Sequence, residues 1–291
     1  MKGIILAGGK ATRLYPLTEV LSKQLLPVYD KPMIYYPLAT LMQAGVRDIM
    51  VITNPENQAA YRRLLRRSHQ RWGVRIQIVS QDEPQGIAQA ITIAADYAFW
   101  PKGEHCFLVL GDNMFHGLTP SLFDKAELFG ATIYLACVRD PQRYGVAEFV
   151  NNTIVKIHEK PAQPSSTYAV TGLYCYDDTA PDMVRNMTPS ARGELEITDL
   201  NNLYLAEKRL AYYKLPASAA WLDAGTPDAL CEASQYVRAV QHRTTSLVGS
   251  PELTALWQGW VTLENITLEF QSREDAYARS VLAALTPALA T

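Results

Sequence analysis

The feature that most constrains the fold of this chain is the alternation, in its first half, of short apolar runs with longer amphipathic stretches. Apolar runs of this length predict strands, and the stretches between them have the length and periodicity of helices. Such an order is typical of a Rossmann-like, mainly parallel α/β sheet flanked by helices, which binds ligands at the carboxyl ends of its strands. The predicted strands are Gly3–Ala7, Asp48–Thr53, Val74–Val79 and Cys106–Leu110, and the predicted helices are Tyr35–Ala44, Gln58–Arg71 and Ile87–Phe99.

After about residue 130 the pattern changes to closely spaced strands with short turns, which predicts an antiparallel addition to the sheet. A helix is predicted from Pro227 onward, and the tail predicts a small helical appendage. We therefore expect a main domain at 1–245 and an appendage at 246–291, although no linker marks the boundary. The strands of this half are predicted at Thr132–Val138, Val146–Val150, Ile154–His158 and Tyr168–Tyr176, and the tail helices at Thr254–Leu256 and at Ala276–Leu285, where Pro287 is expected to end the chain's last helix.

Charge and hydropathy exclude two classes of partner. With 27 basic and 29 acidic residues the formal charge is -2, so no bulk attraction to nucleic acid or to an anionic membrane is expected. No apolar run has the ~18 residues of a spanning helix, and the first residues predict a strand rather than a signal peptide. We expect a cytoplasmic protein. Its four cysteines have no CxxC spacing and are interpreted as reduced core residues, namely Cys106, Cys137, Cys175 and Cys231.

The strongest local motif, Leu6–Leu14, directly follows the first predicted strand and reads Leu-Ala-Gly-Gly-Lys-Ala-Thr-Arg-Leu. Successive amides of a glycine loop can surround phosphate oxygens, and Arg13 would add a forked cationic donor. Alone, the segment is as easily a structural turn. It is neither a P-loop nor a dinucleotide fingerprint, because the glycines of those motifs fall at different spacings.

Two acids occur in settings typical of metal ligands or of turns. Asp112 follows a buried strand in Leu110-Gly111-Asp112-Asn113, and Asp223 lies far along the chain in Trp221–Thr226. An aspartate in such a place either caps a helix or turn, or binds a hard cation, and the local sequence does not separate these roles.

The order of the N-terminal motifs resembles the sugar nucleotidyltransferases. Gly-Gly-x-x-Thr-Arg-Leu is followed by Pro-x-Thr and by Lys-x-x-x-Pro, which begins at Lys23. The segment Tyr29–Leu38 resembles the thymidylyltransferase branch of that family. The resemblance implies the nucleotide-diphospho-sugar transferase fold, with a nucleotide-binding half at about 1–130 and a sugar-binding half at 131–225. It also implies joining of dTTP to glucose 1-phosphate with release of pyrophosphate.

The resemblance further implies roles for individual residues. Arg13, Lys23, Asp112 and Asp223 would act in catalysis, with Asp112 and Asp223 together holding one Mg²⁺. Gln81 would read the pyrimidine edge, because an amide both donates and accepts. The nucleotide would contact Leu6, Gly8, Gly9, Ala11, Thr12, Arg13, Gln24, Gln81, Gly86 and Asp112.

Sugar-phosphate contacts are implied in the second half of the chain. Glu159 would accept hydrogen bonds from sugar hydroxyls, and Lys160 and Arg192 would hold the phosphate. Read alone, these charges are ordinary solvated surface. The complete implied set is Asn113, Tyr144, Gly145, Glu159, Lys160, Val170 and Arg192.

One position departs from the family pattern, which has glycine where this chain has Ala11. If Ala11 has positive φ, its methyl group costs about 1 kcal/mol or displaces the phosphates, while Lys10 adds charge to the loop. Alternatives to the implied reaction are another nucleotide (UTP or CTP), another sugar 1-phosphate, or a weakly catalytic nucleotide-sugar-binding regulator. The family also implies a homotetramer, a dimer of dimers, with a second nucleotide site between subunits and feedback inhibition.

Overall fold

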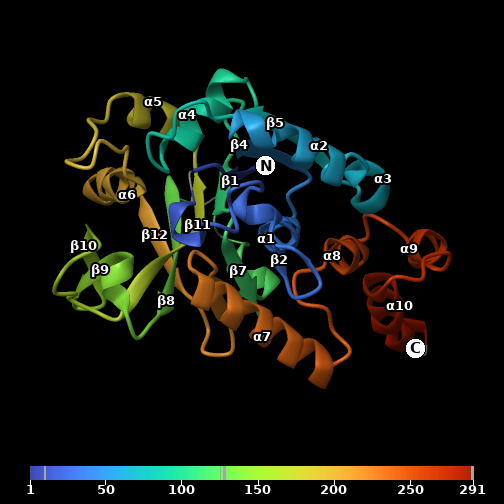
Figure 1. Cartoon of the computed structure of the whole chain (residues 1–291). Coiled ribbons are helices and arrows are strands. Elements are labelled where there is room, and N and C mark those ends of the chain that lie inside the picture. Colours follow the sequence, from blue (N-terminus) through green and yellow to red (C-terminus); the bar gives the residue numbers. More distant parts are fainter. Residues whose placement is uncertain (10, 125, 127–128, 290–291) are drawn as a thin grey trace.

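The computed structural model describes residues 1–9, 11–124, 126 and 129–289, and its centre is a mixed sheet with helices on both faces (Figure 1). Four parallel strands lie side by side in the order β6-β1-β4-β5. Each agrees with a predicted strand to within one residue. Their bounds are Lys2–Ala7 (β1), Asp48–Thr53 (β4), Arg75–Ser80 (β5) and Cys106–Leu110 (β6).

The helices between these strands are α1 (Tyr35–Gln43), α2 (Gln58–Leu65), α3 (Ser68–Trp72) and α4 (Gln89–Asp96). The prediction of one unbroken helix over 58–71 was wrong. Arg67 leaves helical geometry at φ -111° and ψ 16°, and the chain turns so that Trp72 is fully buried with its ring against Tyr35. Burial of that indole outweighs the continuity of an amphipathic pattern.

The antiparallel addition is confirmed. It comprises β8 (Ala131–Cys137), β9 (Gly145–Val150), β10 (Thr153–Glu159) and β11 (Tyr168–Tyr176), with β11 antiparallel to both β6 and β8. Strands β9 and β10 form a hairpin whose turn residues, Asn151 and Asn152, both have positive φ, as a two-residue hairpin turn requires.

Several short elements were not predicted. Strand β12 (Leu210–Lys214) extends the sheet parallel to β8, and β7 (Asn113–His116) pairs with β13 (Ala220–Asp223) in a separate two-stranded ladder. Strands β2 and β3 form a small hairpin, and helices α5 and α6 follow β11. Their bounds are Pro27–Val28 (β2), Lys31–Pro32 (β3), Ala180–Arg185 (α5) and Ile197–Ala206 (α6).

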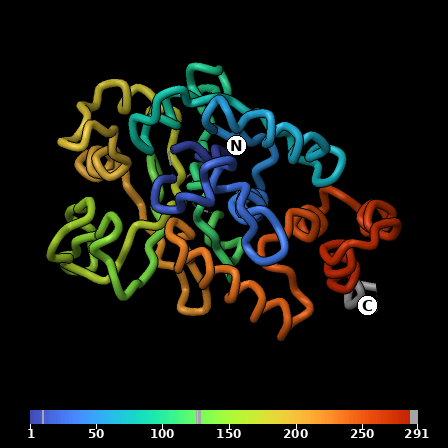
Figure 2. Tube along the Cα trace, viewed as in Figure 1, coloured from blue at the N-terminus to red at the C-terminus, as the bar shows by residue number. Residues whose placement is uncertain are grey.

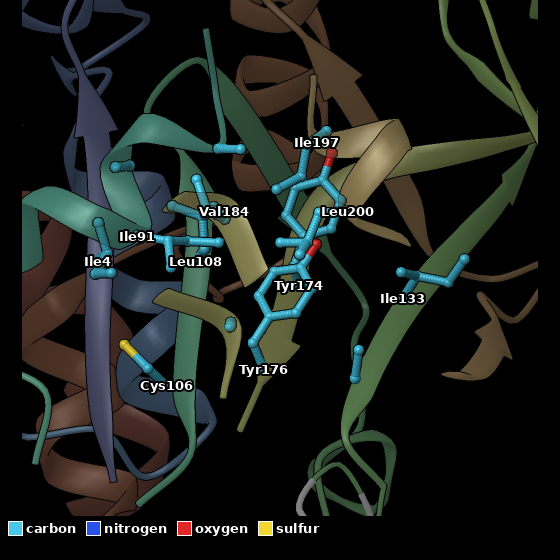
Figure 3. Packing of buried hydrophobic residues seen from close by; sticks show 14 of the residues in the cluster. Ile4, Ile91, Cys106, Leu108, Ile133, Tyr174, Tyr176, Val184, Ile197 and Leu200 are labelled. Carbon is cyan, nitrogen blue, oxygen red and sulfur yellow. The ribbon is translucent and has the colours of Figure 1, made fainter. Parts of the chain in front are cut away.

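The core lies on both faces of the sheet. Ile4 and Ile5 are neighbours on β1 but belong to different buried clusters, because successive strand side chains point to opposite faces. On one face, Ile4 and Leu108 pack beside Ile91 of α4, and Tyr174 and Tyr176 of β11 extend the same cluster toward Leu200 of α6 (Figure 3). The sheet is therefore buried on both sides, as its continuously apolar strands predict.

The C-terminal part is helical, as predicted. Its helices are α7 (Pro227–Arg243), α8 (Pro251–Trp257), α9 (Leu263–Phe270) and α10 (Ala276–Leu289). The first of them, α7, packs against β2 and β13, whereas α8, α9 and α10 lie on the side of the molecule away from the β9–β10 hairpin, with α8 against α1 and α3 (Figure 2). Helix α9 was not predicted. The expected stop at Pro287 was wrong: a proline this near the end of a helix removes one hydrogen bond, and only two further residues follow in α10.

None of the four cysteines, all of which are among the described residues, forms a disulfide, but only two fit the interpretation as core residues. Cys106 and Cys175 are buried, whereas Cys137 and Cys231 are exposed. The correction has a simple cause. Cys137 is the last residue of β8, and Cys231 lies on the solvent face of α7. Within the described part of the chain, no helix is long and apolar enough to cross a membrane.

Candidate active site

A cavity of about 290 Å³ opens at the carboxyl ends of β1 and β6, the edge at which such a sheet is expected to bind ligands. It brings together residues from both halves of the main domain. Thirteen predicted site residues line it: Leu6, Gly8, Arg13, Lys23, Gln24, Asp112, Asn113, Tyr144, Gly145, Glu159, Lys160, Val170 and Asp223.

The glycine loop follows β1 and forms one side of the cavity. A Cβ on Gly8 would lie 2.6 Å from the Gln81 side-chain oxygen, so any larger residue at this position would displace Gln81. Gly9 has φ 98°, and its amide donates to Asn54 at 3.2 Å. Beyond Lys10, which is outside the described residues, Ala11 has φ 44° and ψ 36° and precedes a short 3₁₀ turn. The left-handed conformation considered for Ala11 is thus present, at a cost of about 1 kcal/mol.

Six predicted site residues do not line this cavity: Gly9, Ala11, Thr12, Gln81, Gly86 and Arg192. Gln81 is nevertheless close to it, because its buried side chain lies against Gly8. Its amide nitrogen donates to Gln89 at 2.5 Å, which fixes the side chain. Gly86 has a packing reason to be glycine, since a Cβ there would lie 2.4 Å from the Leu195 carbonyl oxygen.

Asp112 and Asp223 approach one another through the β7–β13 ladder. Asp223 is opposite Asn113 in that ladder, and the Ala224 amide donates to the Asp112 carbonyl at 3.1 Å. The Lys23 ammonium lies 2.5 Å from Asp112 Oδ2. Burial alone would raise the pKa of Asp112, but Lys23 and Asn113 outweigh it and hold the pKa below its usual value.

Asp223 is in the opposite electrostatic situation. Burial, and then repulsion from Asp112, raise its pKa above the ordinary value. Among the described residues its nearest cation is Arg143, at 3.8 Å, which is beyond normal hydrogen-bond length. Carboxylate oxygens are the donors that Mg²⁺ prefers in proteins. The negative charge of Asp112 is balanced by Lys23, whereas that of Asp223 is only weakly balanced. The two carboxylates together therefore fit a Mg²⁺ site, to which substrate phosphates would add further ligands.

Asn113 connects the two carboxylates to the sugar-side strand. Its amide nitrogen donates to Asp112 at 3.1 Å, while its oxygen accepts from Trp221 Nε1 at 2.6 Å and from the Gly172 amide at 3.0 Å. A Cβ on Gly172 would lie 2.5 Å from that oxygen, so glycine is required for the close approach. The network fixes the orientation of Asn113 and with it the rotamer of Asp112.

The opposite side of the cavity is built from β9, β10 and α6. Glu159 ends β10 and accepts from the Thr198 hydroxyl at 2.6 Å, while Lys160 lies 3.3 Å from the same carboxylate. The Lys160 amide donates to the Tyr144 carbonyl at 3.0 Å, which closes the loop beside Gly145. Each carboxylate and ammonium here is held by neighbours but still faces the cavity.

Arg192 lies one step behind this wall. It donates to Glu196 at 2.8 Å and to Glu159 at 3.2 Å, so it reaches the cavity only through Glu159. A phosphate in the cavity would compete with those carboxylates for the guanidinium. The predicted phosphate contact of Arg192 stays a prediction.

Sequence reasoning missed several cavity residues. Arg143 adjoins the predicted Tyr144, and Thr198 and Trp221 act through partners that a linear motif does not reveal. Leu110 and Trp221 lie in the two segments whose aspartates were singled out, 110–113 and 221–226, but neither residue was assigned a role. The full set of unpredicted lining residues is Ile87, Leu110, Arg143, Gly172, Tyr174, Ile197, Thr198 and Trp221.

Comparison with known proteins agrees with this geometry. The family model for nucleotidyl transferases matches residues 2–240. A glucose-1-phosphate thymidylyltransferase of Xanthomonas campestris pv. campestris (strain B100) is 51% identical over 270 residues, which cover 91% of this chain and 90% of that protein. The protein of the same name from Neisseria gonorrhoeae is 47% identical over 287 residues, covering 97% and 98%.

Solved structures give the same result. A Bacillus anthracis protein assigned as a glucose-1-phosphate thymidylyltransferase, in complex with sucrose, has a TM-score of 0.75 and 42% identity, and the match covers 82% of this chain and 95% of that one. A UDP-glucose pyrophosphorylase with a TM-score of 0.70 is 22% identical over 84% of this chain and 99% of its own, which shows a shared fold. The chain therefore belongs to the nucleotidyl transferase family, among the glucose-1-phosphate thymidylyltransferases.

Proposed function

We propose that this protein catalyses the reaction of dTTP with α-D-glucose 1-phosphate to give dTDP-glucose and pyrophosphate. The observation that carries the proposal is the single cavity shared by the glycine loop, the Asp112–Asp223 pair and the Glu159–Lys160 wall. Relatives that match nine-tenths of the chain bear the name of this activity. A cavity with four cationic and three acidic lining side chains suits phosphorylated substrates that bring a divalent cation with them.

The proposed reaction is an in-line displacement at phosphorus. An oxygen of the sugar phosphate forms a bond to the α-phosphorus of the triphosphate, and the bond from that phosphorus to the bridging oxygen of pyrophosphate breaks. The sugar phosphate is largely a dianion near pH 7, with a second pKa of about 6 by analogy with phosphoamino acids, so no protein base is needed. Positioning and charge neutralisation supply the rate enhancement.

The chain's own residues divide this work. Arg13 and the loop amides around Gly8 would hold the triphosphate, with Lys23 beside the reacting phosphate. Glu159 would accept hydrogen bonds from sugar hydroxyls, and Lys160 would bind the sugar phosphate. Asp112 and Asp223 would hold Mg²⁺, which when bound neutralises the α-phosphate and the departing pyrophosphate.

Base selection is proposed for Gln81, whose side-chain oxygen lies against Gly8. Its amide nitrogen already donates a hydrogen bond to Gln89. To donate to a pyrimidine carbonyl as well, this nitrogen would have to use its second hydrogen or give up the bond to Gln89. UTP and CTP would differ from dTTP at contacts to the base and the ribose, and another sugar 1-phosphate would differ from glucose 1-phosphate at contacts to the sugar hydroxyls. Cytoplasmic location and assembly as a feedback-inhibited homotetramer are likewise proposed from family membership alone. In the C-terminal helices, Leu253 is buried within its own chain and Trp257 is 66% exposed.

The test is pyrophosphate release with Mg²⁺ and glucose 1-phosphate, comparing dTTP, UTP, CTP and ATP in the wild type and in Asp112→Asn. We expect a preference for dTTP and a loss of at least about 10³-fold in the variant. Asp96→Asn is the control, because Asp96 is an exposed carboxylate paired with Arg185 away from the cavity. Preference for another triphosphate would contradict the assignment of dTTP, and undiminished turnover in Asp112→Asn would contradict the assigned site.

A further inference from the structure

The segment between Glu56 and Asp82 contains six arginines and no acidic residue. Four of them follow one another along α2 and the turn into α3, and all four are exposed. In the described part of the chain none of the four has a carboxylate within 4 Å, whereas the other two, Arg71 and Arg75, are paired. The four are Arg62, Arg63, Arg66 and Arg67.

This arrangement is unfavourable without a counter-charge. Arg62 and Arg66 are four residues apart in helical geometry, a spacing at which like charges on one helix face destabilise it by a few tenths of a kcal/mol, and Arg63 and Arg67 directly follow them along the chain. The rest of the protein carries a net negative charge, since the whole chain has a formal charge of -2. The positive charge is therefore concentrated locally rather than spread over the surface.

These arginines face a groove. A cavity of about 620 Å³ lies between α2–α3 and α9, which are neighbours in Figure 1, and five of its lining residues are arginines while one is acidic. Tyr35, Ala59, Ala60 and Leu64 contribute apolar surface. The charged lining residues are Arg63, Arg66, Arg67, Arg71, Arg273 and Glu269.

Two of the lining arginines are held in place. Arg71 contacts Glu252 at 2.9 Å and Glu269 at 2.8 Å, although its Nε–H is not aligned as a hydrogen bond on the latter. Arg273 donates to Asp275 at 2.8 Å and lies over the Phe270 ring at 4.9 Å. Both walls are thus positioned before any ligand arrives, and Arg63, Arg66 and Arg67 supply donors without a carboxylate partner.

We infer that the groove between α2–α3 and α9 binds a small anion bearing two or more phosphate groups, and that this ligand ties α9 to α2–α3. Guanidinium groups bind phosphate oxygens in bidentate pairs, and the five lining arginines carry more positive charge than a single phosphate group neutralises. The lining arginines gather on the two sides of one groove, which suits a compact ligand better than a continuous strand of nucleic acid. The site is separate from the catalytic cavity, with which it shares no lining residue.

The test uses inorganic tripolyphosphate as the probe and isothermal titration calorimetry of the full chain. Arg13→Ala removes a phosphate donor of the catalytic cavity and serves as the background for every variant. In that background we expect binding to persist and to weaken at least about tenfold on adding Arg63→Gln and Arg67→Gln, since each removes a charge-assisted contact. The matched control is Arg62→Gln, an exposed arginine on the same helix that does not line this groove.

A second readout separates a bound ligand from a bulk charge effect. Tripolyphosphate should slow amide hydrogen exchange in α9 of the Arg13→Ala protein and leave it unchanged when Arg63 and Arg67 are also replaced. Equal weakening by Arg62→Gln and by an Arg63→Gln single variant would overturn the proposal, because only net charge would then matter. Tighter binding of a single-stranded oligonucleotide than of tripolyphosphate would also overturn it. Turnover of the Arg63→Gln/Arg67→Gln enzyme at saturating substrates should equal that of the wild type.

Discussion

The catalytic cavity and the groove between α2–α3 and α9 both concentrate positive charge, but they balance it differently. In the catalytic cavity Lys23 lies on Asp112, Arg143 faces Asp223, and Lys160 and Arg192 converge on Glu159. In the groove most arginines have no carboxylate partner among the described residues. Compensated charges can exchange partners when substrate and metal bind, without a large change in net charge. Uncompensated charges indicate a site whose counter-ion comes from outside the chain.

The largest expected difference between the two regions is in their dependence on a divalent cation. EDTA is expected to lower turnover by at least about 10³-fold, because Asp112 and Asp223 would then meet the substrate phosphates without a neutralising charge. Tripolyphosphate binding at the groove, measured in Arg13→Ala, should be unchanged by EDTA. Recovery of turnover on adding Mg²⁺ is the control, and full turnover in EDTA would contradict the metal role.

Replacement of Lys23 tests whether the pairing of positive and negative side chains in the catalytic cavity contributes to catalysis. Lys23→Met is expected to reduce kcat by roughly 10²–10³-fold, since it removes a cation placed next to developing phosphate charge. The measurement is steady-state pyrophosphate release, with thermal melting to confirm folding. Lys102→Met, at an exposed lysine, should leave kcat unchanged. A Lys23→Met enzyme with normal kcat would show that the Lys23–Asp112 pair is only structural.

Replacement of Glu252, which lies at the edge of the groove, tests how much a buried ion pair contributes to the stability of the folded protein. Glu252 is 1% exposed and accepts from Arg71 at 2.9 Å and from Tyr277 at 2.7 Å. Glu252→Gln leaves the Arg71 charge without its buried partner and is expected to lower the free energy of unfolding by about 3 kcal/mol. Urea unfolding measures this change, with the exposed Glu264→Gln as control. An unchanged midpoint would mean that the pair contributes nothing to docking of α8.

The smallest expected effect concerns the backbone of the glycine loop. Ala11 and Ala98 both have positive φ, at 44° and 52°. Replacing either by glycine should relieve strain and raise the free energy of unfolding by about 0.5 kcal/mol, after allowing for the greater freedom of glycine in the unfolded chain. Only Ala11→Gly should also change the KM for dTTP. A KM change of the same size in Ala98→Gly would argue against a role of the loop geometry.

Local sequence signals predicted the parallel half of the fold well because its strands are continuously apolar. The break between α2 and α3 could not be predicted, since Trp72 is buried by residues distant in sequence. Strands β7 and β13 were missed for a related reason. Each has four residues, and their pairing joins segments about a hundred residues apart.

The site shows the same limit. Arg13, Lys23 and Asp112 were predicted because they lie in motifs that resemble those of the sugar nucleotidyltransferases, and the structure brings them to one cavity. Thr198 was missed, because its contact with Glu159 depends on where α6 lies against the end of β10. The arginine run of α2 was readable as charge, but the opposite wall with Arg273 appears only in three dimensions.

The β7–β13 ladder has a consequence for the order in which the protein is made. Asp112 is synthesised well before Asp223, which lies 111 residues later in the chain and comes close to Asp112 only when β13 pairs with β7. A nascent chain shorter than this could fold its glycine loop and β1–β6 sheet and still lack the second carboxylate. Activity would then appear late in synthesis and in one step, so that incomplete chains hold nucleotide without consuming it.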